Sequence, residues 1–251
     1  MNLLRFASLS LAIVLSGLSG VASAQWGNLK GQFVLDGAIP APKEIQVPGN
    51  IPVKGKIFDE SLVVGEKGGI ANIVIYVRTK DVKVHPDYAK TEKDSVKYDN
   101  INFQFKPHVA VLRLSQTLEV ANSDPQSHNS NFQPLGDEGI NPLLTPGQSV
   151  KYTANRPQTI PQKVSCNIHP WMGGYILFRP DPYATVTDKE GNFELKNLPT
   201  GELEFQIWHE KAGYLVADPK WDKGRVTLTI KAGDNTLGNG PIKVPAKLFD
   251  K

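Results

Sequence analysis

Hydrophobic and polar residues alternate in many short stretches of the chain, and turns rich in proline and glycine separate these stretches. Alternation places every second side chain on one face of a strand, so each stretch predicts a β-strand with one buried face. The 22 glycines and 19 prolines, with few long stretches at helical spacing, favour an all-β fold. The predicted strands comprise residues 29–35, 101–105, 109–114, 118–121, 184–188, 193–195, 202–207, 226–230 and 242–244.

Three segments depart from this alternation. Residues 70–77 are apolar almost throughout, which suits a strand that is buried on both faces. Residues 39–52 are rich in proline and predict an irregular passage. Residues 82–100 are the most polar part of the chain, and we expect a short helix or a loop at the surface there.

Residues 1–24 combine an early basic residue, Arg5, with an apolar run and the small-residue sequence Ala22-Ser23-Ala24 at its end. This is the pattern of a secretory signal peptide with an A-x-A cleavage site. The alternative, a retained anchoring segment, is disfavoured because the apolar run is short for a bilayer and no stop-transfer sequence follows. We therefore expect a periplasmic or secreted protein with no membrane span after cleavage.

The charge and length of the chain bear on nucleic-acid binding and on the number of domains. The 28 Lys and Arg residues nearly balance the 25 Asp and Glu residues, so the net charge gives no support for nucleic-acid binding. Residues 25–251 are too many for one small sandwich, and they suit either a core with additions or two small domains.

The candidate chemistry lies in the stretch 165–174, which contains the only cysteine, Cys166, together with His169 and Met172. Thiolate and thioether are soft ligands and imidazole is borderline, a mixture that suits copper better than zinc, calcium or magnesium. An exported protein normally keeps its cysteines in pairs, and a metal ligand would explain a single thiol. The alternative is a buried free cysteine that acts as a small hydrophobic residue. His128 lies upstream at a distance that lets a strand-rich chain return to the same end of a sandwich, and it offers a second imidazole.

This order, His128 and then Cys-x-x-His-x-x-Met, resembles the type 1 (blue) copper proteins of the cupredoxin superfamily, and the short loop is similar to the amicyanin and plastocyanin type. The resemblance covers roughly residues 98–180. Within this range, the segments 103–107 and 118–122 are similar to the first strands of the family. It implies a Greek-key β-sandwich that binds one copper ion.

The resemblance also implies the role of each site residue. His128, Cys166 and His169 would form the trigonal plane around copper, and Met172 would be the weak axial ligand. Asn129 is the candidate for holding the ligand loop, with an ordinary loop asparagine as the alternative. Residues 155–162 depart from the family because prolines interrupt them, so the strand that enters Cys166 should be short or bulged.

Residues 181–251 form a second region. A predicted hairpin, with a turn at residues 189–192, is followed by a Leu-Pro-x-Gly sequence, and the whole resembles the carboxypeptidase regulatory-like (prealbumin-like) β-sandwich. That resemblance implies scaffolding or adhesion, not catalysis. Residues 25–97 would be an N-terminal β segment that is possibly part of this second sandwich. The copper domain is then either inserted between the two parts of that sandwich or placed before it as a consecutive domain.

Three function classes fit these features: transfer of single electrons to a transient redox protein partner, copper carriage, and a non-catalytic binding or structural module. We expect no enzyme, because a multicopper site needs many more imidazoles than remain in His85, His108 and His209, and a binuclear site needs a second cysteine. His108 should be solvated and not a third imidazole ligand, and His209 should be structural or at the surface. Carriage usually goes with tracts rich in Met or His, which the chain lacks.

Overall fold

The computed structural model describes residues 26–250, so the predicted signal peptide lies outside the described residues. The fold is all-β, as predicted. The first strands are β1 (Trp26–Asp36), β2 (Val74–Val77), β3 (Ser95–Ile101), β4 (Gln104–Lys106), β5 (Val109–Arg113), β6 (Thr117–Asn122), β7 (His128–Asn129), β8 (Asn131–Phe132), β9 (Leu143–Leu144) and β10 (Ser149–Tyr152). The others are β11 (Gln162–Ser165), β12 (Gly173–Arg179), β13 (Ala184–Val186), β14 (Asn192–Pro199), β15 (Gly201–His209), β16 (Gly213–Tyr214), β17 (Arg225–Ile230), β18 (Gly233–Thr236) and β19 (Ile242–Pro245). Short 3-10 helices lie at η1 (Pro86–Thr91), η2 (Asp222–Gly224) and η3 (Ala246–Phe249).

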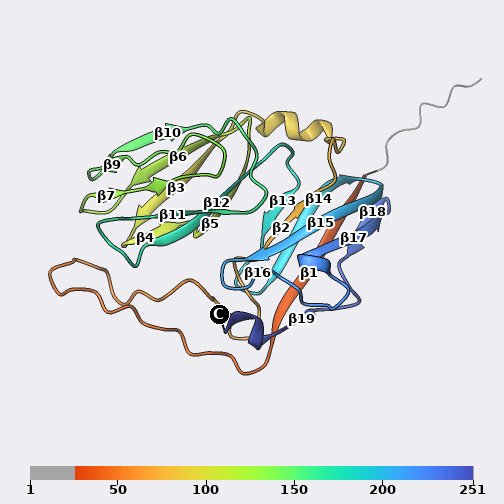
Figure 1. Cartoon of the computed structure of the whole chain (residues 1–251), viewed down its shortest axis with the longest axis horizontal. Helices are drawn as coiled ribbons and strands as arrows, with labels where there is room; N and C mark the ends of the chain where they lie inside the picture. The colour runs from red at the N-terminus through yellow and green to blue at the C-terminus, as the bar shows by residue number, and fades with distance from the viewer. Residues whose placement is uncertain (1–25, 251) are drawn as a thin grey trace, which may run out of the picture.

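Strands β3 to β12 form a first sandwich, at the left in Figure 1. One of its sheets has the strand order β10-β6-β3-β4 and the other has the order β5-β12-β11-β8, while β7 pairs with β9. Both sheets turn apolar side chains into one core, which includes Tyr98, Phe105, Leu112, Val120 and Phe178. Cys166 and Met172 of the stretch 165–174 also pack in this core.

A second sandwich lies at the right in Figure 1 and joins both ends of the described chain. Strand β1 lies between β14 and β18 and also pairs with β19, and β2 lies between β13 and β15. The two sheets enclose a core that includes Phe33, Ile75 and Phe205. The N-terminal strands are therefore paired with strands from the C-terminal region, and the first sandwich lies between them in the sequence.

Strand β2 explains why residues 70–77 are so apolar. Ile75 and Val77 face the core of the second sandwich, whereas Val74 and Tyr76 face a third cluster that joins the two sandwiches. Leu177 of β12 and Trp208 of β15 meet in this third cluster. The predicted burial on both faces is confirmed, but the strand is only Val74–Val77, since Asn72 has a left-handed backbone with φ of 64°.

The hairpin of β3 and β4 corrects two expectations. The predicted strand over residues 101–105 is wrong, because Asn102 and Phe103 have φ of 51° and 59° and form the turn between β3 and β4. Residues 82–100 contain the short 3-10 helix η1 at the surface, but they also contain most of β3, whose Tyr98 is fully buried. The sequence did not predict β3 because the strand contains the polar residues Asp99 and Asn100. Both side chains are buried, and hydrogen bonds compensate for their burial.

The region after residue 181 folds into strands near the predicted positions but with a different pairing. Strands β13 and β14 do not form the predicted hairpin, since β13 pairs with β2 and β14 pairs with β1. The turn is present nonetheless, because the N–H of Gly191 donates to the carbonyl of Asp188 at 2.9 Å. The chain therefore crosses at this turn from one sheet of the second sandwich to the other.

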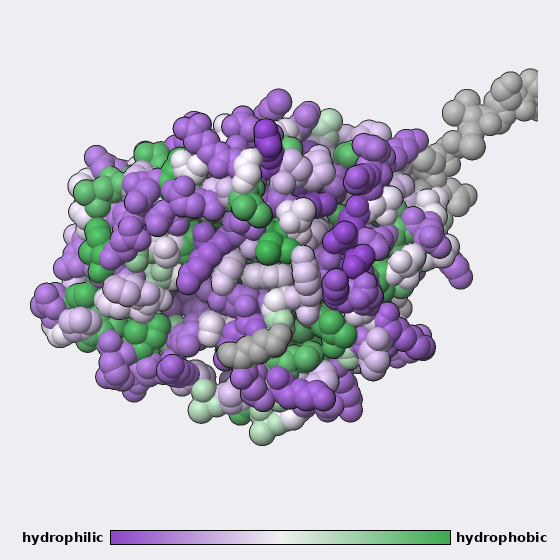
Figure 2. Space-filling view, viewed as in Figure 1, coloured by the Kyte–Doolittle hydropathy of each residue, from purple (hydrophilic) through white to green (hydrophobic). Residues whose placement is uncertain are grey.

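The face of the molecule in Figure 2 is mostly hydrophilic, with scattered small hydrophobic areas. No helix in residues 26–250 is long and apolar enough to cross a membrane.

Candidate metal centre

His128 is the first residue of β7 and follows the loop that joins β6 to β7. The side-chain amide of Asn122, at the end of β6, donates to the carbonyls of Gln126 at 2.8 Å and Leu144 at 2.9 Å. The N–H of Asp124 donates to Oδ1 of Asn122 at 3.0 Å. The Asn122 side chain thereby provides hydrogen-bond partners for backbone groups of the buried loop. These bonds fix the conformation of the loop and hence the position of His128 at the start of β7.

The other candidate ligands lie on one closed loop between β11 and β12. The N–H of Cys166 donates to the carbonyl of Met172 at 3.2 Å, and the N–H of Met172 donates to the carbonyl of His169 at 2.9 Å. Strand β11 has four residues, so the expectation of a short strand before Cys166 is confirmed. A tight loop brings side chains that are three and six residues apart to one place.

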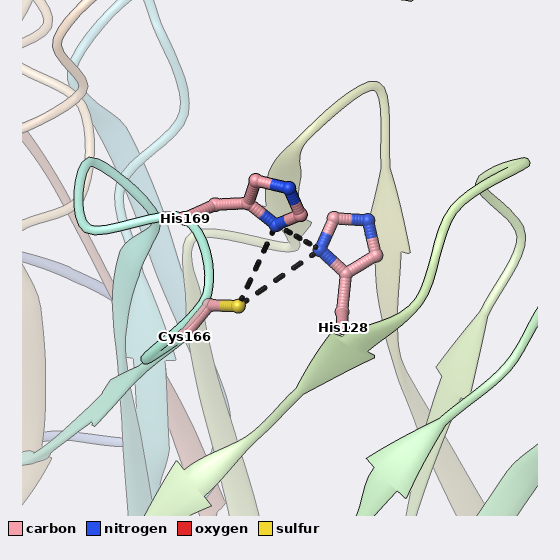
Figure 3. A group of neighbouring side chains, drawn as sticks. All are labelled: His128, Cys166 and His169. Carbon is pink, nitrogen blue, oxygen red and sulfur yellow. Dashed lines mark hydrogen bonds between the residues drawn. The ribbon is translucent and has the colours of Figure 1, made fainter. Parts of the chain in front are cut away.

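The structure brings His128, Cys166 and His169 together, as the sequence predicted. Figure 3 shows the sulfur and the two Nδ1 atoms pointing toward one another, from β7 and from the loop after β11. Sγ of Cys166 lies 4.0 Å from Nδ1 of His128 and 3.7 Å from Nδ1 of His169, and the two nitrogens are 3.0 Å apart. These three separations place one point about 2.1 Å from all three atoms, which is the length of a metal–nitrogen bond and close to that of a metal–sulfur bond, about 2.3 Å.

Met172 completes a buried His-Cys-His-Met cluster. Its side chain lies in the core of the first sandwich together with that of Cys166, and each residue is 2% exposed. Two imidazoles, a thiolate and a thioether, shielded from water, form the donor set of a type 1 copper site. The residues present therefore fit a copper ion.

The surroundings of the candidate ligands shift their pKa values. Burial raises the pKa of the Cys166 thiol, but a hydrogen bond with His128 and backbone N–H groups outweigh burial, so the pKa is below its ordinary value. Burial and the neighbouring His128 lower the pKa of His169. A thiol that ionises readily beside the neutral imidazole of His169 favours metal binding. Burial lowers the pKa of His128, but Asp124 and Cys166 outweigh burial and raise it, so a metal competes with a proton at that ring.

Asn129 contacts the ligand loop in the expected manner. Its Oδ1 accepts the N–H of Asn167 at 2.7 Å and lies 3.4 Å from Sγ of Cys166. Its amide donates to Oδ1 of Asn141 at 2.6 Å. The residue ties β7 to the Cys166 loop, so the two halves of the site are held in one geometry.

Two neighbours of the site were missed from the sequence. The ring of Phe103 lies edge-on to both imidazoles, at centroid distances of 5.2 Å from His128 and 5.0 Å from His169. Oδ2 of Asp124 lies 3.0 Å from Nε2 of His128. The place of Asp124 four residues before His128, in a turn-forming Asn-Ser-Asp-Pro sequence, was the available signal. Phe103 gave none, because it was assigned to a strand.

The remaining histidines lie elsewhere. His108 is buried and not solvated as predicted: its Nε2 contacts Oε1 of Glu210, in the second sandwich. His209 is fully buried, which makes it structural. His85 caps the start of η1 by accepting the N–H of Asp87 at 3.1 Å.

No protein-family model and no curated protein sequence matches the chain. Among solved structures, the chain is similar to a Cu-containing nitrite reductase (NirK) from Thermus scotoductus SA-01, with 24% sequence identity and a TM-score of 0.31. That similarity covers 34% of this chain and spans 22% of the nitrite reductase chain. The chain is also similar to mutant forms of amicyanin, one reduced and one in the Cu(I) state, with 16% and 15% identity and a TM-score of 0.31 for each. Each of these similarities covers 42% of this chain and 98% of the amicyanin chain.

Proposed function

We propose that this protein is an exported type 1 copper protein that carries single electrons between redox partners. The observation that supports this proposal most strongly is the preformed triangle of Sγ of Cys166 and Nδ1 of His128 and His169. These three atoms and the thioether of Met172 would hold a copper ion, which would supply the one-electron couple. Ligands that are already in place need little rearrangement when an electron arrives or leaves.

Burial favours electron transfer over catalysis. His128 and Cys166 are 0% and 2% exposed, and His169 is 4% exposed, so a substrate has no direct path to these donor atoms. Electron transfer does not require the redox partner to touch the metal. The partner only has to come close to one of the ligand side chains. The protein is therefore proposed to be a carrier and not an enzyme, with a transient redox protein as its partner and the periplasm or exterior as its compartment.

The second sandwich is proposed to be a regulatory-like β module that holds the copper domain. We place the copper domain at residues 98–180, inserted between the N-terminal β segment 25–97 and residues 181–251. The pairing of β1 and β2 with strands after residue 181 supports insertion over consecutive domains. The shared cluster with Leu177 and Trp208 gives the two sandwiches an apolar contact.

The test is to load residues 25–251 with Cu(II) and record the visible spectrum and a one-electron reduction. Wild type should develop an intense thiolate-to-copper absorption and be reduced reversibly, and Cys166→Ser should show neither. Copper bound without that absorption would favour copper carriage. Absence of binding would favour the structural module.

A further inference from the structure

The carboxylate of Asp124 lies behind His128, on the opposite side of the ring from Cys166. Oδ2 of Asp124 is 3.0 Å from Nε2 of His128, whereas Nδ1 of the same ring faces Cys166 and His169. The contact has the length of an ion pair although it is not aligned as a hydrogen bond. Asp124 is 6% exposed and His128 is 0% exposed, so water competes little for either group.

The same carboxylate holds the turn between β3 and β4. It accepts the N–H of Asn102 at 2.5 Å and the N–H of Phe103 at 2.7 Å. Both residues have left-handed backbones, which side chains other than glycine seldom adopt. The turn lays the Phe103 ring against both imidazoles. One side chain therefore fixes the orientation of His128 and the position of the ring that packs on it.

The charge of Asp124 is directed at His128. In residues 26–250, no lysine or arginine forms an ion pair with Asp124, whereas the neighbouring buried carboxylate of Asp99 pairs with Lys97 at 2.7 Å. The two oxygens of Asp124 accept the backbone N–H groups of Asn102 and Phe103, and its ion-pair contact in the described residues is with His128. The carboxylate is therefore a negative charge at the remote nitrogen of a candidate ligand.

We propose that Asp124 is a positioning residue for the metal centre: it keeps the proton of His128 on Nε2, presents the Nδ1 lone pair to copper, and makes His128 a stronger donor. This inference rests on the proposed copper function. A stronger anionic environment at a ligand favours Cu(II) over Cu(I), so Asp124 lowers the reduction potential of the site. Carboxylates that contact the remote nitrogen of a ligating histidine act in this manner in metal sites generally.

The test compares Asp124→Asn with Asp99→Asn. Both variants remove one negative charge and replace one hydrogen-bond-accepting carboxylate oxygen with an amide. Asp99 lies in β3 and holds the β6–β7 loop from outside, since it accepts the N–H of Ser123 at 3.0 Å and its hydroxyl at 2.7 Å. Only Asp124 contacts His128. We expect Asp124→Asn to lose Cu(II) affinity by about tenfold or more. If Cu(I) affinity is unchanged, that tenfold loss raises the potential by about 59 mV. Asp99→Asn should lose stability but keep the potential.

A second measurement is independent of copper and of the variants. Nitrogen-15 NMR of the copper-free wild type should show His128 protonated at Nε2 and unprotonated at Nδ1. The proposal is overturned if His128 is the opposite tautomer, or if Asp124→Asn binds Cu(II) with wild-type affinity and potential. It is also overturned if Asp99→Asn shifts the potential as much as Asp124→Asn does. Failure of wild type to bind copper at all would refute the proposed function instead, and the tautomer would still be measurable.

Discussion

Nδ1 of His128 lies 3.0 Å from Nδ1 of His169, although 41 residues separate them in the sequence. Two ring nitrogens this close, beside a sulfur atom, either share a proton in a hydrogen bond or hold a cation between them, and a metal ion can bond all three atoms at once. We therefore expect copper to stabilise the fold. At a free copper concentration a hundred times the dissociation constant, the free energy of unfolding should rise by about 2.7 kcal/mol. Thermal unfolding with and without copper measures this gain, and Cys166→Ser should lose most of it.

Met172 should tune the site without being required for its colour. Met172→Leu keeps the volume of the buried side chain nearly constant, so stability should change by less than about 1.5 kcal/mol. The loss of a weak axial donor destabilises Cu(II) more than Cu(I), and the potential should rise. Voltammetry and the visible spectrum test this together. A variant that lost its colour as completely as Cys166→Ser would argue against an axial role.

The sequence was sufficient to predict which candidate ligands come together because most of them lie on one short stretch. Cys166, His169 and Met172 are close in sequence and are rare residue types here, so their spacing indicated one short loop with soft metal ligands. His128 was identifiable through the resemblance, and strands that bury one face, such as β5, were predicted from alternation. The apolar run that includes β2 predicted burial on both faces because each face of that strand meets a different core.

Long-range polar contacts could not be predicted in the same way. Asp124 accepts the N–H groups of Asn102 and Phe103 only because the β3–β4 turn and the β6–β7 loop meet at one end of the first sandwich. His108 was expected in solvent, but its partner Glu210 is 102 residues away, in the second sandwich. The predicted hairpin is wrong because β13 pairs with β2 and β14 pairs with β1, so neither strand pairs with the other. The local sequence predicts that a segment is a strand, but which strand it pairs with depends on all the strands of the sheet.

Gly174 should be intolerant of a side chain. An added Cβ would lie 2.7 Å from the carbonyl oxygen of His108 and closer still to the hydroxyl of Tyr98, both in a packed core. Gly174→Ala should therefore lower the free energy of unfolding by about 3 kcal/mol, the upper end for overpacking. Gly173→Ala is the matched control, because the nearest atom to its Cβ would be Cε of Lys163 at 4.0 Å. Chemical denaturation of both variants would decide, and equal effects would refute the packing argument.

His209 should make the fold sensitive to acid. Burial, with His108 and Lys211 nearby, lowers the pKa of His209 to about 3, whereas the ring in the unfolded chain takes a proton near pH 6.5. The unfolded state therefore binds the extra proton first as the pH falls. Stability should be fully present above about pH 6.5 and decrease toward pH 3 by up to about 1.4 kcal/mol per pH unit. His209→Gln should flatten this part of the curve of copper-free protein relative to wild type, and His85→Gln should not.

Trp171 should serve both packing and electron exchange. Its half-buried ring packs on the core of the first sandwich, lies 5.3 Å from the His169 ring, and donates from Nε1 to the carbonyl of Phe103 at 3.3 Å. Full truncation of a buried tryptophan costs about 3–5 kcal/mol, so a half-buried one should cost about 2 kcal/mol in Trp171→Ala.

Because His169 itself is buried, a redox partner can touch the exposed part of the Trp171 ring and the exposed residues Ile168 and Pro170 beside it. Small, weak encounters of this kind depend on a few contacts, so electron self-exchange should slow by about tenfold in Trp171→Ala. Leu135→Ala is the control, because Leu135 is 82% exposed and lies outside the ligand loop. NMR line broadening in mixtures of the Cu(I) and Cu(II) forms measures the rate. Normal exchange with a stability loss of about 3 kcal/mol or more would show that Trp171 acts only in packing.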